Sequence, residues 1–219
     1  RSHLTDLLSA MLPPEWGYAP RILAPLLATL QMSVTGTALG AFFALLLAPF
    51  CTEALHTPRP LRALLRLLIQ VLRSFPALVL ALLATFLFGL GTFAGTFSGT
   101  VAITVYTFAI LTRLTYEDIE TTDLTAYRAL CAMGATSARA YWRAVVPGIA
   151  PSYFSNVLYL LETNVRHSSI LGYVGAGGIG APLIFAMNKY NWSRAGAILL
   201  GLILLVWIMD VVSGKLAEK

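Results

Sequence analysis

The segment TTDLTAYRALCAMGATSARAYWRAVVPGIAP, residues 121–151, is the one long water-compatible stretch in an otherwise apolar sequence. It predicts two short helices that are joined by a glycine turn. We expect the first helix at 126–133, with Thr125 as its N-cap and Gly134 as the left-handed residue that ends it.

The second helix of this segment is expected to begin with Ser137 as its N-cap. It should end before Pro147, because proline has no backbone donor and disfavours helical geometry at the residue that precedes it. At about 3.6 residues per turn, each helix presents one shared face. These faces consist of Ala126, Ala129, Leu130 and Met133 on the first helix, and of Ala138, Tyr141, Trp142 and Val145 on the second.

The two faces differ in chemistry. Small residues on the first helix permit the close approach of another surface, and the aromatic pair on the second suits a membrane interface. We interpret the segment as a docking surface. The simpler interpretation is an ordinary cytoplasmic loop that contains two helical turns.

The composition of the whole sequence is that of an integral membrane protein. Of its 219 residues, 58% are hydrophobic and 11% are charged, and the mean hydropathy is +0.76. The formal net charge of +5 would suggest nucleic-acid binding in a soluble protein. Here the basic residues lie mostly between apolar runs, where they set membrane topology. We therefore expect membrane lipid around the chain and no nucleic-acid partner.

The sequence lacks the motifs of an enzyme or of a metal site. It contains no HExxH, GxSxG or GK[ST] pattern and no carboxylate signature of an enzyme. Cys51 and Cys131 are far apart, which indicates two free thiols and neither a disulfide framework nor a metal site. We therefore expect no catalytic residue, no metal and no cofactor in this chain.

Apolar runs long enough to cross about 30 Å of hydrocarbon predict an all-α membrane protein with five spans. Residues 1–24 are broken by three prolines and are expected to form an extracytoplasmic or interfacial segment. The transmembrane domain then occupies 25–219. Its predicted spans are 25–50, 77–90, 98–114, 149–171 and 195–212.

Two features concern the packing of the first two spans. Gly36 and Gly40 have the GxxxG spacing that lets two membrane helices pack closely. Before the second span, four polar side chains fall within about a quarter-turn of one another and predict an amphipathic helix on the membrane, which residues 74–76 kink inward. These four residues are Arg62, Arg66, Gln70 and Arg73.

Glycines mark two further connections. The turn between the second and third spans is predicted at Gly89, Gly91, Gly95 and Gly99. GYVGAGGIG, residues 172–180, follows a membrane helix and no strand, so it is not a dinucleotide-binding fingerprint. We expect backbone flexibility and close packing from the glycines of this loop, which are Gly175, Gly177, Gly178 and Gly180.

The predicted fourth span is the most polar of the five. Glu162 and Arg166 are one helical turn apart, so each partly neutralises the other within the membrane. Two interpretations are open: a structural ion pair, or a translocation pathway or gate in which Arg166 attracts an anion and Glu162 keeps it from trapping the substrate. We expect the second role for the whole polar set, which comprises Glu162, Asn164, Arg166, His167, Ser168 and Ser169.

The basic residues between the spans predict the orientation of the chain. The helix before the second span, the segment 121–151 and the C-terminus are expected in the cytoplasm, and the loop 172–194 outside. The cytoplasmic set comprises Arg59, Arg62, Arg66, Arg113, Arg128, Arg139, Arg143, Lys215 and Lys219, against Arg1, Arg21, Lys189 and Arg194 on the other side.

YRALCAMGA at 127–135, followed by VVPGIAP at 145–151, resembles the cytoplasmic coupling segment of ABC importer permeases. The pattern of that family is an acidic residue, two small residues, a glycine and a later proline. Three further stretches narrow the resemblance to permeases of phosphonate importers, and it then covers nearly the whole chain from Pro13. These stretches are RSFPALVLALL at 73–83, FGLGTFAG at 88–95 and LETNVRHSSILGYVGAGGIG at 161–180.

The resemblance implies a type I, methionine-permease-like core of five transmembrane helices with a cytoplasmic coupling helix, in the inner membrane of a bacterium. The chain would form the pathway for phosphonate-type anions. The family docks the coupling segment into a groove of its ATPase. The resemblance places this contact on Arg128, Ala129, Leu130, Gly134, Ala135 and Pro147.

The resemblance also implies partners: a second copy of the permease, two cytoplasmic ATPase subunits and an extracytoplasmic solute-binding protein. ATP and Mg²⁺ would be held by the ATPase, and this subunit would hydrolyse nothing. Two departures stand out. Arg128 occupies the position of the family's acid, so the ion pair with the ATPase would be reversed in sign or absent. The family usually has one more N-terminal span, and we expect such a span upstream of Arg1.

Two alternatives remain at this stage. A permease for a related solute, such as phosphite, a phosphate-like anion or a methionine-type solute, would have the same architecture, because the binding protein largely sets the substrate. A membrane-embedded enzyme would need a catalytic set of residues, and the sequence shows none.

Overall fold

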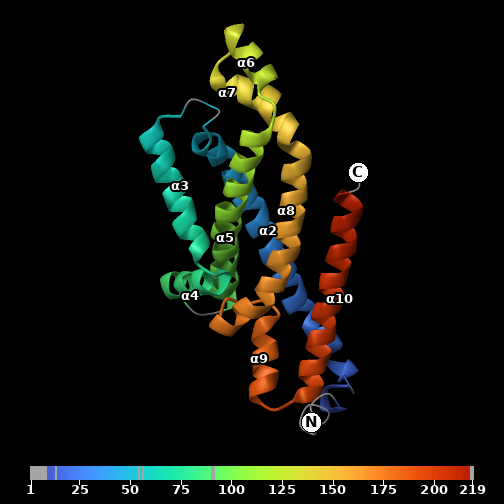
Figure 1. Cartoon of the computed structure of the whole chain (residues 1–219). Helices are drawn as coiled ribbons and strands as arrows, with labels where there is room; N and C mark the ends of the chain where they lie inside the picture. Colours follow the sequence, from blue (N-terminus) through green and yellow to red (C-terminus); the bar gives the residue numbers. More distant parts are fainter. Residues whose placement is uncertain (1–8, 13, 54, 56, 90–91, 218–219) are drawn as a thin grey trace. The chain divides into compact units, whose positions relative to one another are not determined.

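The computed structural model describes residues 9–12, 14–53, 55, 57–89 and 92–217. Arg1, Gly91 and Lys219, which entered the orientation and turn predictions, lie outside these residues. The described chain is helical and contains no strand, which confirms the predicted all-α fold (Figure 1). Its elements are η1 (Trp16–Tyr18), α2 (Ala19–Cys51), α3 (Arg59–Ser74), α4 (Ala77–Phe88), α5 (Thr92–Thr121), α6 (Thr125–Ala132), α7 (Ser137–Ala140), the π turn η2 (Tyr141–Val145), α8 (Val146–Leu171), η3 (Gly172–Val174), α9 (Gly180–Asn188) and α10 (Trp192–Ala217).

The helices belong to two compact units, which are described one at a time below. The long helices α2, α5 and α8 each contribute to both. The first unit contains α4, α9, α10 and the polar part of α8, and the second contains α3 and the segment 121–151. Their bounds are Arg1–Gly36, Ala77–Ile103 and Leu161–Lys219 for the first unit, and Thr37–Pro76 and Thr104–Leu160 for the second.

Four helical stretches of the described chain are long and apolar enough to cross a membrane, namely Pro20–Cys51, Gly95–Thr121, Ser137–Val174 and Trp192–Leu216. A fifth span results if the pair α3 and α4, which is bent by 93°, is counted as one. Helix α4 has 12 residues. At 1.5 Å per residue it reaches about 18 Å, too short to cross the hydrocarbon core alone. The predicted number of five spans is therefore reached only if α3 and α4 together form one span.

The glycine pair of α2 lies against α5 at very short range. In the second unit, a Cβ atom added to Gly40 would lie 2.7 Å from Cβ of Thr107 and 2.8 Å from the carbonyl oxygen of Thr104. In the first unit, a Cβ atom on Gly36 would lie 2.6 Å from Cγ2 of Ile103. Neighbouring atoms would have to move to admit any side chain at either position. The close packing predicted from the GxxxG spacing is confirmed.

Part of the predicted glycine turn after the second span is wrong. Gly89 follows α4 with a φ of +90°, as a turn requires, but Gly95 and Gly99 lie inside α5. A Cβ atom on Gly99 would lie 2.8 Å from the carbonyl oxygen of Ala176, and Gly95 is similarly close to the backbone of Gly175. These two glycines are needed because the backbone of another segment of the first unit touches α5.

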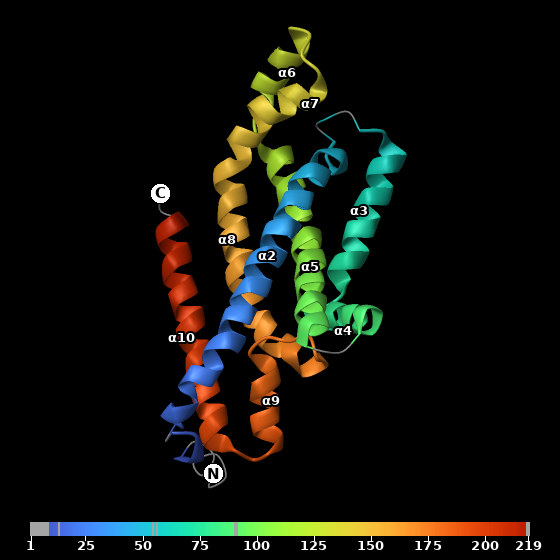
Figure 2. The ribbon, with the colours of Figure 1, turned by 180° about the vertical axis from the view of Figure 1, so that it is seen from behind.

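The predicted loop at 172–194 contains a helix. Helix α9 lies beside the N-terminal part of α10 in both ribbon views (Figures 1 and 2). Ala186 of α9 and Ile198 of α10 are buried in one apolar cluster, and Tyr190, at a φ of 54°, turns the chain between the two helices. Helix α9 was not predicted, because it is only 9 residues long and no side chain caps its first turn.

The predicted end of a helix before Pro147 is also wrong. Helix α7, the π turn and α8 form one continuous helix. The N–H of Val146 donates to the carbonyl of Tyr141 across the wider π turn. Pro147 follows in the first turn of α8, where the wider turn leaves room for its ring beside the preceding carbonyls. Proline is therefore compatible with an unbroken helix here.

We expect the substitution Gly40→Ala to destabilise the protein, because the added methyl group overpacks the contact of α2 with Thr104 and Thr107. Overpacking of this kind costs about 1–3 kcal/mol. Gly214→Ala is the matched control, since nothing lies within 4 Å of a Cβ atom at this helical glycine. The control should be neutral or stabilising by up to about 1 kcal/mol. Thermal unfolding midpoints in detergent measure both effects, and an equal response to the two substitutions would contradict the packing argument.

Candidate functional site

The second unit carries the segment that the sequence singled out. We call α6, the turn that follows it and α7 the coupling hairpin, residues 125–140 (Figure 1). Gly134 ends α6 with a φ of +88°, which confirms the predicted left-handed conformation. The N–H of Gly134 donates to the carbonyl of Cys131, and the N–H of Ala135 donates to the carbonyl of Leu130, each at 3.0 Å. This is the Schellman arrangement, in which the last carbonyls of a helix find donors beyond its end.

The first residues of both short helices differ from the prediction. Helix α6 begins at Thr125 itself, and the carboxylate of Asp123 accepts its N–H at 2.9 Å and its hydroxyl at 2.6 Å. These two bonds lower the pKa of Asp123 from its ordinary value. Helix α7 is capped by Thr136, whose hydroxyl accepts the N–H of Arg139 at 3.4 Å, and not by Ser137. Both helices therefore begin one residue earlier than predicted, at Thr125 and Ser137.

The coupling hairpin presents small and apolar side chains outward. Tyr127, which is 2% exposed, lies on its inner side, and Tyr141, the first residue after the hairpin, donates its hydroxyl to the carbonyl of Leu45 at 3.1 Å. Ala129 is exposed, and Met133 is 75% exposed at the turn. The face predicted for the first helix therefore lies at the surface, apart from Leu130, which is half-buried against the core of the unit. The face predicted for the second helix is partly wrong, because Tyr141 and Val145 are buried and only Ala138 and Trp142 are exposed.

The predicted coupling residues do not all lie together. Arg128, Ala129, Gly134 and Ala135 belong to the hairpin, whereas Pro147 lies in the first turn of α8. Pro147 is exposed, and the helix continues through it. The hairpin thus forms the compact part of the predicted docking surface.

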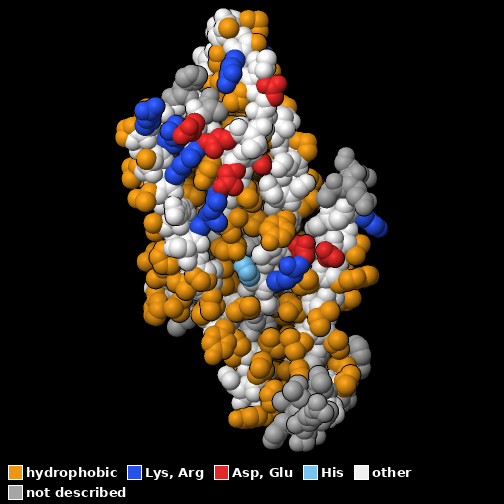
Figure 3. Space-filling view, viewed as in Figure 1, with side chains coloured by type: hydrophobic (Ala, Val, Ile, Leu, Met, Phe, Trp, Pro, Cys, Tyr) orange, Lys and Arg blue, Asp and Glu red, His pale blue; other side chains and the backbone are white. Residues whose placement is uncertain are grey.

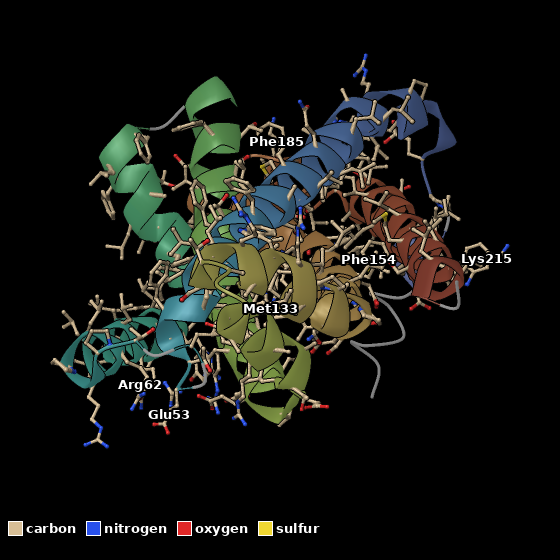
Figure 4. All side chains as sticks on the ribbon, turned by 90° about the horizontal axis from the view of Figure 1, so that it is seen from above. Glu53, Arg62, Met133, Phe154, Phe185 and Lys215 are labelled. Atoms are coloured by element: carbon tan, nitrogen blue, oxygen red, sulfur yellow. The ribbon has the colours of Figure 1, made fainter. Side chains whose placement is uncertain are left out.

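Charged side chains surround the start of α6 in the same unit. Figure 3 shows acidic and basic side chains gathered over α3 and the end of α5. Glu53 and Arg62 lie side by side in Figure 4 and form an ion pair of 2.8 Å. Next to the hairpin is an open hollow of about 520 Å³. It is lined by Glu53, Glu120, Thr122, Asp123, Leu124 and Arg128.

Sequence reasoning missed the role of two carboxylates in this hollow. Neither Glu53 nor Glu120 has a function predicted from the sequence. The two lie at the end of different helices, and no local pattern brings them together. Arg128 lies among carboxylates of its own chain, namely Glu53, Glu120 and Asp123.

The first unit carries the predicted charged pair. Glu162 and Arg166 form an ion pair on α8, with side chains that are 16% and 51% exposed. Asp210 of α10 lines the same groove, whose volume is about 380 Å³. The groove therefore contains one more carboxylate than guanidinium. Its remaining lining is apolar and consists of Leu202, Ile203, Val206 and Trp207.

The sequence analysis missed Asp210. It lies inside the predicted last span, 195–212, close to its end. Helix α10 brings it to α8 through tertiary packing, which a local pattern does not reveal.

The other polar residues of α8 point in several directions. Asn164 and Ser168 are fully buried, and the hydroxyl of Ser33 donates to that of Ser168 at 3.4 Å. The hydroxyl of Ser169 donates to the carbonyl of Arg166 at 2.6 Å. His167 is half-buried. The structure therefore places Glu162 and Arg166 in one groove and does not assemble all six predicted residues there.

The glycine loop after α8 is held by close backbone contacts. Gly175, Gly177 and Gly178 have φ values of +79°, +74° and +71°. The hydroxyl of Thr29 accepts the N–H of Ile179 at 2.7 Å. Gly180 opens α9, where a Cβ atom would meet the backbone of α8. Close packing is thus observed, and flexibility of the loop stays a prediction.

Solved structures with this fold belong to ABC transporters. The crystal structure of an amino acid ABC transporter with histidines matches with a TM-score of 0.71 at 19% identity and covers 92% of this chain and 93% of that one. An inward-facing structure of the MetNI methionine ABC transporter matches with a TM-score of 0.74 at 21% identity, over 90% and 94% of the two chains. The fold is therefore that of an ABC importer permease.

Sequence relatives agree with this class. The phosphite transport system permease protein PtxC of Stutzerimonas stutzeri is 31% identical over 216 residues, which are 98% of this chain and 77% of the relative. The phosphate-import permease protein PhnE of Mycolicibacterium smegmatis is 31% identical over 212 residues, 96% of this chain and 39% of the relative. The probable D-methionine transport system permease protein MetI of Vibrio cholerae is 28% identical over 187 residues, 84% and 83% of the two chains.

Residues 36–217 match the family of binding-protein-dependent transport system inner membrane components, and the chain belongs to this family. It is an inner-membrane permease subunit of an ABC transporter. The resemblance inferred from the coupling segment and the glycine loop is thereby confirmed at the level of the family.

We expect Glu162→Gln to lower the amount of folded protein in the membrane, because Arg166 loses its partner on α8. An unpaired arginine at mid-span costs roughly 2.5–3.5 kcal/mol on insertion scales. The double substitution Glu162→Gln with Arg166→Gln should restore the yield, measured as the monodisperse fraction after extraction in mild detergent. Asp210→Asn is the control, with a smaller loss expected because it leaves the ion pair on α8 intact. Equal yields of the single and double variants would contradict this account.

Proposed function

We propose that this chain forms the translocation pathway for phosphonate-type and phosphite-type anions in an ABC importer. The observation that carries the proposal is the 31% identity with a phosphite transport permease over 98% of the chain. A phosphate-import permease and a putative cryptic phosphonate transport permease of Escherichia coli are further relatives. The substrates in these names, phosphite, phosphate and phosphonate, are all tetrahedral phosphorus oxyanions, which supports this class of substrate.

The assembly that we propose contains two copies of the permease, two cytoplasmic ATPase subunits and an extracytoplasmic binding protein. ATP and Mg²⁺ bind to the ATPase, and the permease hydrolyses nothing itself. The coupling hairpin is the contact with the ATPase, because it offers an exposed, small-residue surface on a rigid turn. Arg128 lies among the chain's own carboxylates, so docking through shape accounts for this contact better than the ion pair of the family pattern.

The groove on α8 is proposed as part of the pathway or its gate. Arg166 supplies the charge that attracts an anion, and its half-exposed side chain is accessible. Glu162 and Asp210 compete with the anion for the guanidinium, which keeps binding weak enough for release. In the double variant Glu162→Gln with Arg166→Gln, we expect the yield to recover while uptake stays lost. Recovery of uptake would reduce the pair to a structural role.

Reconstitution in proteoliposomes tests the proposed function. The permease, its ATPase and its binding protein are combined, and uptake of labelled phosphite, methylphosphonate, phosphate and D-methionine is compared with and without ATP inside. We expect ATP-dependent uptake of at least one phosphorus oxyanion and none of D-methionine. Uptake of D-methionine alone would assign the chain to the methionine type instead, and transport independent of ATP would contradict an ABC importer.

We expect Gly134→Val to leave the permease in the membrane but to weaken its association with the ATPase. A β-branched residue fits poorly at a φ of +88°, and the turn should lose about 1 kcal/mol or more. Arg128→Glu is the control on the same hairpin, because an exposed charge usually contributes less than about 1 kcal/mol. Co-purification of the ATPase with the tagged permease measures both. Undiminished recovery of the ATPase with Gly134→Val would remove Gly134 from the docking role.

A further inference from the structure

Arg66 of α3 lies at the C-terminal end of α2. Its Nε–H donates to the carbonyl oxygen of Cys51, the last residue of α2, at 2.7 Å. The last carbonyls of a helix have no intrahelical donor and form the negative end of its dipole. Arg66 therefore satisfies one of these carbonyls with a charge-assisted hydrogen bond, and α3 is tied to the end of α2.

The same guanidinium reaches the end of α5. One of its terminal nitrogens contacts the carboxylate of Glu120, and its centre lies 4.7 Å from the centroid of the Tyr116 ring. The carboxylate oxygen of Glu120 also accepts the N–H of Glu53 at 3.2 Å, just beyond α2. The Arg66–Glu120 pair thus joins α3 to the ends of both α2 and α5.

The last turns of α5 are tied on a second side to α8. The carboxylate of Asp118 accepts the hydroxyl of Ser152 at 2.7 Å and the side-chain amide of Asn156 at 3.4 Å. Only residues 122–124 separate the end of α5 from the coupling helix α6. A displacement of the coupling hairpin therefore acts first on a stretch of α5 that is fixed by Asp118 and Glu120.

A neighbouring ion pair on α5 provides a comparison. Arg113 and Glu117 lie one turn apart on the same helix at 2.6 Å, and their side chains are 44% and 45% exposed. This pair joins no second helix. The side chains of Arg66 and Glu120 are less exposed, at 32% and 31%, and the bonds that they make connect separate helices. Both pairs consist of an arginine and a glutamate, but only the Arg66–Glu120 pair connects separate helices, so we expect different effects when each pair is broken.

We infer that Arg66 and Glu120 are positioning residues for coupling, which carry a movement of the coupling hairpin into α2 and α3. The inference rests on the proposed function, because it presupposes an ATPase that moves the hairpin. Arginine suits this role because its planar guanidinium donates in two directions at once, to Cys51 and to Glu120. Without the pair, the ATPase would still dock on the hairpin, but its movement would reach α2 and α3 less completely.

The test compares uptake per ATP hydrolysed in proteoliposomes that contain the complete transporter. Glu120→Gln keeps the shape of the side chain and removes its charge, and Glu117→Gln does the same on the control pair. We expect Glu120→Gln to lower uptake per ATP about tenfold, within the usual range of coupling between two sites. Glu117→Gln should stay within about twofold of the wild type, as expected for an exposed pair. Co-purification of the ATPase should be unchanged in both variants.

A charge exchange separates positioning from folding. In the double variant Arg66→Glu with Glu120→Arg, the ion pair is restored with its sign reversed, while the bond to Cys51 is lost. We expect each single substitution to lower uptake per ATP and the double variant to recover part of it. Arg66→Lys retains the charge but has a single nitrogen in place of the planar guanidinium, whose separate nitrogens reach Cys51 and Glu120, so it should resemble Glu120→Gln more than the wild type.

Several outcomes would overturn the inference. Uptake per ATP in Glu120→Gln within twofold of the wild type would remove the pair from coupling, and so would an equal loss in Glu117→Gln. Loss of the ATPase from purified Glu120→Gln would show a role in assembly instead. Failure of the proposed function is distinguishable, because the wild-type complex itself would then show no ATP-dependent uptake.

Discussion

An unbroken helical backbone runs from Ser137 to Leu171 and joins the coupling hairpin to a membrane helix. Within a membrane every backbone polar group needs an internal partner, so a helix that enters the bilayer cannot simply stop and restart. The π turn at Tyr141–Val145 keeps the hydrogen bonding continuous and admits Pro147 without a break. The second half of the coupling hairpin is therefore the N-terminal extension of a membrane helix, and a partner that moves it acts directly on α8.

Backbone atoms take part in the contacts between the long helices. Glycines let α2 and α5 approach until a methyl group no longer fits. In the second unit, the hydroxyls of Tyr141 and Tyr153 donate to the carbonyls of Leu45 and Ala41 on α2, at 3.1 Å and 2.5 Å. Since the surrounding lipid is as apolar as leucine, such close packing and hydrogen bonding, more than hydrophobic burial, distinguish one arrangement of membrane helices from another.

Local chemistry decided which parts of the fold and site could be predicted. The left-handed Gly134, the kink at 74–76 and the apolar spans each follow from residues that are adjacent in sequence. The errors arose where a partner distant in sequence decides. Gly95 and Gly99 were predicted to form a turn. They are glycines because the backbone of the loop after α8 touches them, and this contact is not visible in the local sequence. No function was predicted for Glu120 or Asp210, because their partners are distant in sequence. Glu120 pairs with Arg66, and Asp210 lines the groove on α8 only in the folded chain.

Cross-linking shows whether the coupling hairpin contacts the ATPase, as proposed above. Single cysteines are introduced as Met133→Cys and Tyr190→Cys in a background that lacks Cys51 and Cys131. Both sites are well exposed, at 75% and 79%. A short reagent with a maleimide at one end and a succinimidyl ester at the other, which joins the cysteine to a lysine of the ATPase, is applied to the assembled transporter. The account predicts a covalent permease–ATPase product from Met133→Cys and none from Tyr190→Cys. A product from Tyr190→Cys alone, with Met133→Cys unreacted toward the ATPase, would contradict it.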